Sequence, residues 1–202
     1  MKIKMLSLAL VTIITGFSLA CFPLRAEAGE PTNQVKETVD AVMKILDDKE
    51  LKKPEKQKER RASIRQTIVK RFDFEEMAKR SLAAHWKDRT PAEQKEFVAL
   101  YSDLLENTYI RKIERYENEK VVYYDERIDG DYAAVKTKIV DNKGLSIPVE
   151  YRILRKKDKW EVYDIIVEGV SLVNNYRTQF TQIIRSSSYN ELVKRVRGKV
   201  IK

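Results

Sequence analysis

The chain has 202 residues and carries 40 lysines and arginines against 31 aspartates and glutamates, a formal net charge of +9. A surplus of this size is typical of proteins that contact nucleic acid, an anionic membrane surface or acidic partners. With one histidine, one cysteine and six glycines, the sequence excludes zinc sites of the usual histidine and cysteine spacing and glycine-rich phosphate loops.

The first 28 residues have the pattern of a secretory signal peptide. Lys2 and Lys4 precede the uncharged run 5–24, and the small-x-small triplet 26–28 follows. We expect cleavage after Ala28. An uncleaved membrane anchor is one alternative, because the uncharged run is long enough to span a bilayer. A lipoprotein attached through Cys21 is another.

Cleavage would leave residues 29–202 as the mature chain. That chain contains no thiol, so its stability must come from a hydrophobic core and not from disulfides. No second long apolar segment follows, and we expect a soluble exported protein. Export argues against a nucleic-acid partner and leaves anionic lipids or acidic proteins.

The first half of the mature chain has helical periodicity. Apolar residues recur at helical spacing over 35–46 and again over 64–72, and the charged run 52–61 between them is expected to be a solvated face. Asp73 is placed to cap a helix. Thr90, Pro91 and Glu93 predict a capping box at the start of a long helix with a wide apolar face.

The periodicity then changes to that of strands. Strands are predicted over 120–127, 132–140, 145–156 and 160–167, separated by short turns, and hairpin succession makes them an antiparallel meander. A long helix is expected from Ser171, followed by a short basic helix.

Helices followed by a meander and further helices predict an α+β fold with one domain over residues 29–202. Its parts are mainly helical (29–115), an antiparallel sheet (116–170) and C-terminal helices (171–202). We expect a curved four-stranded sheet packed by helices, a nuclear-transport-factor-like cone with a helical subdomain and an apolar interior cavity.

No catalytic motif is apparent, and we predict no catalytic residue, metal site or cofactor. His85 is expected to be structural. Asp164 interrupts an apolar strand and would be the general base if the cone were that of an isomerase or hydratase. The alternative for Asp164 is a capping carboxylate.

Several segments carry a family resemblance. They are residues 72–74, Trp86, residues 90–97, residues 149–151 and, most specifically, residues 162–180. Together they resemble the periplasmic phospholipid carriers of the Mla pathway, the toluene-tolerance auxiliary family. One departure is the triplet 83–85, where the family pattern leads us to expect a glycine.

The resemblance implies a periplasmic shuttle that maintains outer-membrane lipid asymmetry. Its implied partners are a phospholipid ligand, an inner-membrane lipid ABC transporter complex with its lipid-binding ring protein, and an outer-membrane lipoprotein complex. A hopanoid carrier of the same family is an alternative cargo class. An envelope adaptor with a filled interior and the cone-fold isomerase remain as alternatives outside lipid transport.

A carrier of this kind needs an apolar lining, because each exposed methylene costs about 0.8 kcal/mol in water. Tyrosines suit its rim, since a ring and a hydroxyl can face dry and wet sides together. Arg177 is a candidate for the lipid phosphate or for an ion pair with Glu168, and the basic C-terminal residues 194–202 are a candidate docking surface. The predicted lining, with Arg177 at the headgroup end, is Phe97, Tyr101, Leu104, Leu105, Tyr109, Ile147, Val149, Tyr151, Ile153, Val170, Tyr176, Arg177, Phe180 and Ile183.

Overall fold

The computed structural model describes residues 29–116 and 118–200, with the side chain of residue 200 left out. The predicted signal peptide therefore lies outside the described residues. Within these two ranges, no helix combines the length and the apolar composition needed to cross a membrane.

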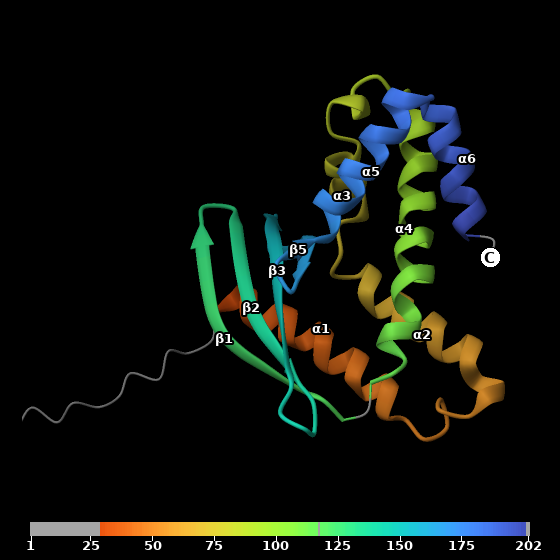
Figure 1. Ribbon diagram of the computed structural model, residues 1–202. Coiled ribbons are helices and arrows are strands. Elements are labelled where there is room, and N and C mark those ends of the chain that lie inside the picture. The colour runs from red at the N-terminus through yellow and green to blue at the C-terminus, as the bar shows by residue number, and fades with distance from the viewer. Residues whose placement is uncertain (1–28, 117, 201–202) are drawn as a thin grey trace, which may run out of the picture.

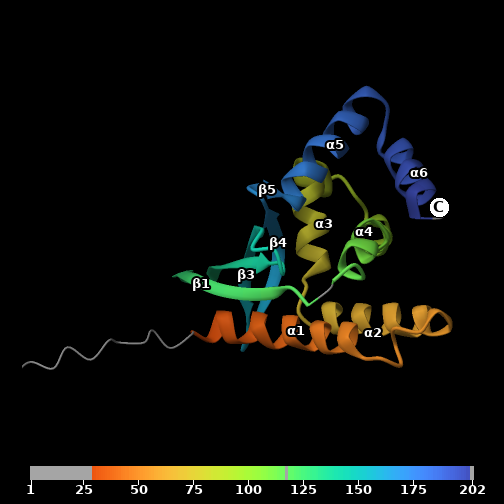
Figure 2. The same cartoon turned by 60° about the horizontal axis from the view of Figure 1, so that its bottom comes forward.

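The N-terminal helices α1 (Glu30–Asp47) and α2 (Gln57–Val69) form a hairpin, joined by the short helix η1 (Pro54–Lys56). Helix α1 runs along one face of the sheet (Figure 2), where Val35 is buried with residues of three strands. Its first turn is held by Thr32, whose backbone N–H and hydroxyl both donate to Glu126. The start of the predicted apolar stripe, with Val35 and Val39, thus packs on the sheet, whereas Leu46 packs with Ile64 of α2. The charged run is exposed over residues 52–59.

A second group of helices stands beside the sheet (Figure 1). It contains α3 (Phe74–Leu82), the short η2 (Ala83–Trp86), α4 (Pro91–Ile113), α5 (Leu172–Ser186) and α6 (Tyr189–Val200). The predicted caps are confirmed: Asp73 accepts from the N–H of Glu76 at 3.0 Å, and Thr90 and Glu93 form a capping box. Local sequence alone therefore fixes where α3 and α4 begin.

The sheet is an open antiparallel meander in the order β1-β2-β3-β4-β5. Its strands are β1 (Lys120–Asp129), β2 (Tyr132–Val140), β3 (Ser146–Lys156), β4 (Lys159–Val167) and β5 (Val170–Ser171). The α+β class and the four predicted strands are confirmed. The fifth strand was missed because two residues are too short to show alternation.

The turn between β4 and β5 places the start of α5 against the sheet edge. Glu168 and Gly169 both have positive φ, at 51° and 81°, which reverses the chain within two residues. Ser171 then caps α5 by accepting from the N–H of Asn174. The segment 162–180, which carries the strongest resemblance, is this strand, turn and helix start.

Within the triplet 83–85, Ala83 has the backbone conformation for which the family pattern leads us to expect a glycine. Its φ is 51° and its ψ is −124°, a region in which a Cβ atom is unfavourable and glycine is the usual residue. The backbone keeps this conformation because α3 must turn abruptly into η2 to bury Trp86, which is 9% exposed.

We expect Ala83→Gly to raise the free energy of unfolding by about 1 kcal/mol, because it removes strain at positive φ. The neighbouring Ala84→Gly is the control, since Ala84 lies within η2 and is exposed; it should lower stability by about 0.5 kcal/mol. Urea unfolding of both variants tests the pair. A loss of stability in Ala83→Gly would contradict the assignment.

Candidate functional site

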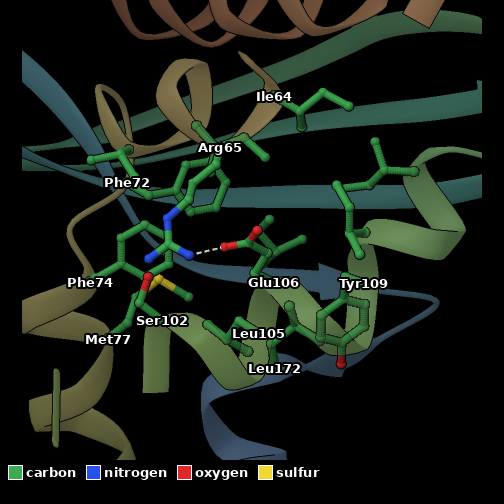
Figure 3. A pocket seen from close by; sticks show the side chains of 15 residues that line it. Ile64, Arg65, Phe72, Phe74, Met77, Ser102, Leu105, Glu106, Tyr109 and Leu172 are labelled. Atoms are coloured by element: carbon green, nitrogen blue, oxygen red, sulfur yellow. Dashed lines mark hydrogen bonds and ion pairs between the residues drawn. The ribbon is translucent and has the colours of Figure 1, made fainter. Parts of the chain in front are cut away.

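An apolar cavity of about 130 Å³ lies where α2, α3, α4, β4 and the start of α5 meet (Figure 3). Its walls are almost entirely aliphatic, aromatic or sulfur-containing side chains, and only three members are polar or charged. The lining residues are Ile64, Arg65, Ile68, Val69, Phe72, Phe74, Met77, Ser102, Leu105, Glu106, Tyr109, Ile110, Ile113, Ile165 and Leu172.

The walls follow from helical and strand periodicity. Ile64 and Ile68 are four residues apart and face the same way from α2, and Leu105 and Tyr109 repeat that spacing on α4. Ile165 points inward from β4. Each element therefore contributes an apolar face to one shared space.

Ion pairs join α2 to α4 at the cavity edge. Arg65 pairs with Asp103 at 2.8 Å and with Glu106, and Figure 3 shows the pair with Glu106 among the lining side chains. Further along, Glu114 accepts from Arg60 and Arg61 at 3.0 and 2.7 Å. These contacts tie α2 to the C-terminal half of α4 and its end, and the charged groups of Arg65 and Glu106 in the cavity wall are paired with each other. We call the Arg65–Asp103–Glu106 group the latch.

Glu114 makes the acid stability of this junction testable. Its hydrogen bond with Arg61 lowers the pKa of the Glu114 carboxyl below its ordinary value of 4.5. A lowered folded-state pKa contributes stability above the unfolded value, and that stability is lost as the pH falls through the folded one. We expect Glu114→Gln to unfold about 1 kcal/mol more easily at pH 7 and to lose less stability below pH 4.5. Denaturant titrations from pH 7 to pH 3 measure both.

The control for this titration is Glu55→Gln, since Glu55 is exposed in η1. It should follow the wild-type pH dependence. A Glu114→Gln curve parallel to that of the wild type below pH 4.5 would contradict the role given to this carboxyl.

Behind the cavity, the helices α4 and α5 share an aromatic cluster. Phe97, Tyr101, Tyr176 and Phe180 contact one another with ring centroids 5.4–6.1 Å apart. Burial raises the pKa of Tyr101 well above its ordinary value and that of Tyr109 to about 12. Both tyrosines stay neutral at physiological pH, and Tyr109 is the one of them that lines the cavity.

The structure distributes the predicted lining residues over four places. Leu105 and Tyr109 line the cavity. Val170 is exposed, and Arg177 is exposed and donates to Asn174 instead of pairing with Glu168. The core of the helical group contains Phe97, Tyr101, Leu104, Tyr176, Phe180 and Ile183, and the sheet contributes the buried or half-buried Ile147, Val149, Tyr151 and Ile153.

Sequence reasoning missed the contribution of α2 and α3 to the cavity. The stripe that includes Ile64, Ile68 and Phe72 is apparent as a repeat, but a repeat alone does not distinguish a cavity wall from core packing. Phe74 lies in one of the segments that carry the family resemblance, but its place in a cavity wall is not apparent from the sequence. The sequence does not show which segment each apolar face packs against, because that depends on contacts between segments far apart in the chain.

Asp164 has the geometry of a capping carboxylate. It is 4% exposed, and its two oxygens accept from the Ser171 hydroxyl at 2.6 Å and from the Val173 N–H at 3.0 Å. It therefore fixes the start of α5 against β4. Among the described residues, no group of histidine, cysteine and carboxylate side chains is placed to hold a metal ion.

Comparison with known proteins identifies the family. The intermembrane phospholipid transport system binding protein MlaC of Haemophilus influenzae is 22% identical over 138 residues, which cover 66% of this chain and 64% of that protein. The toluene tolerance protein ttg2D of Pseudomonas putida is 26% identical over 110 residues, or 54% of this chain and 51% of that protein. The chain thus spans between about half and two thirds of these curated relatives.

A solved structure agrees over a longer stretch. The phospholipid-binding protein from Ralstonia solanacearum, determined in complex with a phospholipid, superposes with a TM-score of 0.73 at 25% identity. The superposition covers 86% of this chain and 98% of that one. The sequence model of the family described as MlaC protein matches residues 36–198, which is most of the chain. The chain therefore belongs to the MlaC protein family.

Proposed function

We propose that this protein is a periplasmic phospholipid carrier that holds acyl chains in the cavity between α2, α3, α4 and β4. The observation that carries the proposal is the apolar cavity, in a chain whose relatives are named for phospholipid binding and transport. We further propose that the predicted signal peptide directs it to the periplasm.

The energetic reason for a carrier is the exposure of acyl chains to water. Two chains of about fifteen methylenes each would cost on the order of 20 kcal/mol if they crossed the periplasm unprotected. An apolar cavity removes that cost during transfer. Release then requires a partner that offers the chains an equally apolar site.

The cavity must widen to hold such a cargo. Its volume of about 130 Å³ equals roughly four water molecules in the liquid, and pockets for drug-sized ligands are roughly 300–1,000 Å³. We propose that α2 moves away from α4 as chains enter, since the ion pairs of the latch connect these helices through a largely solvent-accessible Arg65.

The latch gives a kinetic prediction. We expect Arg65→Ala to speed the transfer of a fluorescent phospholipid from loaded protein to acceptor vesicles about fivefold, because surface ion pairs contribute up to about 1 kcal/mol. High salt should speed the wild type toward the variant. Lys36→Ala, which breaks an exposed ion pair with Asp40 on α1, is the matched control. Equal transfer rates in the wild type, Arg65→Ala and Lys36→Ala would contradict the role proposed for the latch.

The wider pathway is part of the proposal. The carrier would receive and deliver lipid between an outer-membrane lipoprotein complex and an inner-membrane ABC transporter complex with its ring protein, and so maintain outer-membrane asymmetry. A hopanoid is the second candidate cargo. Vesicles that contain either labelled phosphatidylethanolamine or a labelled hopanoid, offered to the lipid-free protein, distinguish them by which label the protein extracts. Extraction of neither would contradict the carrier function.

A further inference from the structure

A second depression, which we call the basic cleft, lies on the other side of β4 and α5 from the apolar cavity. Its volume is about 650 Å³. Ile165 and Leu172 face the cavity, whereas the adjacent Ile166 and Val173 face the basic cleft. The basic cleft is lined by Lys79, Arg80, Ala83, Arg152, Tyr163, Asp164, Ile166, Gly169, Ser171, Val173, Asn174 and Arg177.

Cations dominate this lining. Lys79, Arg80, Arg152 and Arg177 come from three separate elements, α3, β3 and α5, and Asp164 is the one carboxylate that lines the cleft with them. Three segments far apart in the sequence thus bring four positive charges to one concave surface. Such an arrangement raises the local concentration of anions more than the same charges on a flat surface.

The single lining carboxylate is already compensated. Asp164 is buried and accepts from Ser171 and from the N–H of Val173 in the first turn of α5. Its charge therefore lies against the positive end of the α5 dipole, where a carboxylate is favourable. It does not neutralise the arginines that face the opening.

Arg80 is held in place before any ligand arrives. Its guanidinium lies 4.1 Å from the ring centroid of Tyr163, and Tyr163 packs edge-on against Tyr132 at 6.0 Å. Its Nε donates to Glu76 at 2.7 Å. A guanidinium carries five N–H donors. Tyr163 and Glu76 orient the Arg80 guanidinium, and the hydrogen bond to Glu76 uses its Nε–H.

The remaining cations of the cleft have solvent-accessible side chains with one polar partner each, and that of Arg177 is Asn174. Lys79 shares Glu76 with Arg80 at 3.3 Å, and Arg152 pairs with Glu150 at 3.1 Å. The side chains of Lys79 and Arg152 are 54% and 46% exposed, and exposed ion pairs of this kind contribute little. A dianionic or diester phosphate can replace them at small cost.

We propose that the basic cleft is a binding site for a phosphate group. Arginine guanidinium edges match the oxygen geometry of phosphate, with two parallel N–H donors per contact, and a cleft of this volume admits a phosphorylated glycerol. The phosphate belongs either to a lipid headgroup or to a soluble phosphate ester. The proposal does not rest on the acyl-chain cavity, since the two depressions lie on opposite sides of the same elements.

The test titrates lipid-free protein with inorganic phosphate, glycerol 3-phosphate and dihexanoylphosphatidylglycerol, at constant ionic strength set with chloride. Backbone amide shifts of Ile166, Gly169 and Asn174 report the cleft. We expect saturable shifts, and we expect Arg80→Gln and Arg152→Gln each to weaken binding about tenfold, in line with the loss of a charged hydrogen bond. Arg111→Gln removes an exposed cation at the end of α4 and should leave binding unchanged.

Two further results identify the source of the phosphate. Equal binding of the three probes assigns the cleft to soluble phosphates. Binding of the lipid at least about tenfold tighter than glycerol 3-phosphate assigns it to a lipid headgroup. Arg80→Lys keeps the charge but not the two-pronged contact, and it should bind more weakly than the wild type.

Shifts no larger than those caused by chloride, or arginine variants that bind as tightly as Arg111→Gln, would overturn the proposal. The outcome is separable from that of the carrier function. If the protein extracts phospholipid from vesicles but binds no phosphate, only the phosphate site in the basic cleft is contradicted. If the protein binds phosphate but extracts no lipid, only the carrier function is contradicted.

Discussion

Ser102→Trp is expected to empty the protein of lipid, reducing bound phospholipid at least about tenfold, because an indole would occupy the space that acyl chains must enter. Ser102 is on α4, where it lines the cavity beside Arg65 (Figure 3). The measurement is phospholipid phosphorus per protein after purification, together with extraction from vesicles.

The matched control is Ala92→Trp. Ala92 lies in the first turn of the same helix, is exposed, and is ten residues before Ser102, about 15 Å along the helix axis. It should retain the wild-type lipid content. Urea unfolding must show that Ser102→Trp remains folded, since overpacking costs roughly 1–3 kcal/mol. A folded Ser102→Trp protein with full lipid content would place the cargo elsewhere.

Asp164→Ala is expected to lower the free energy of unfolding by about 3 kcal/mol, because two hydrogen bonds to a charged, buried acceptor are lost and the Val173 N–H is left without its partner. Asp164→Asn keeps one acceptor oxygen and should lose about half as much. Urea unfolding with comparison of midpoints and slopes measures the effect. Asp129→Ala, at the exposed end of β1, is the control and should change stability by less than about 0.5 kcal/mol.

This prediction separates the two roles considered for Asp164. A capping carboxylate is needed for stability, and its replacement by asparagine should weaken the anchor of α5. A catalytic base is needed only for turnover, and its replacement should leave stability unchanged or increased. A fully stable Asp164→Asn protein would therefore restore the isomerase alternative.

Local patterns were sufficient to predict most of the secondary structure. The caps at Asp73 and Thr90 depend on residues at most three positions away, and the strand ends follow turns at 129–131 and 141–144. Strand β5 lacked a pattern because it has two residues. The glycine expected near Ala83 was an accurate sign of an unusual backbone, although it could not indicate the conformation itself.

The site was harder to predict because it is made by distant contacts. Arg65 and Asp103 are 38 residues apart, and Arg60 and Glu114 are 54 apart. The apolar face of α4 was recognised, but its residues divide between the cavity, which includes Leu105, and a packed aromatic core, which includes Phe97 and Tyr101. Periodicity shows which residues turn inward and does not show which of them meet empty space.

The measurement that most directly tests the carrier function is native mass spectrometry of the protein purified from the envelope of its own organism, followed by lipid extraction. The carrier function predicts a co-purifying phospholipid or hopanoid near one molecule per protein, as expected for a pocket that buries most of one ligand. The same protein should exchange that cargo with vesicles. A protein that carries no lipid, and that takes none from vesicles, would contradict the carrier function.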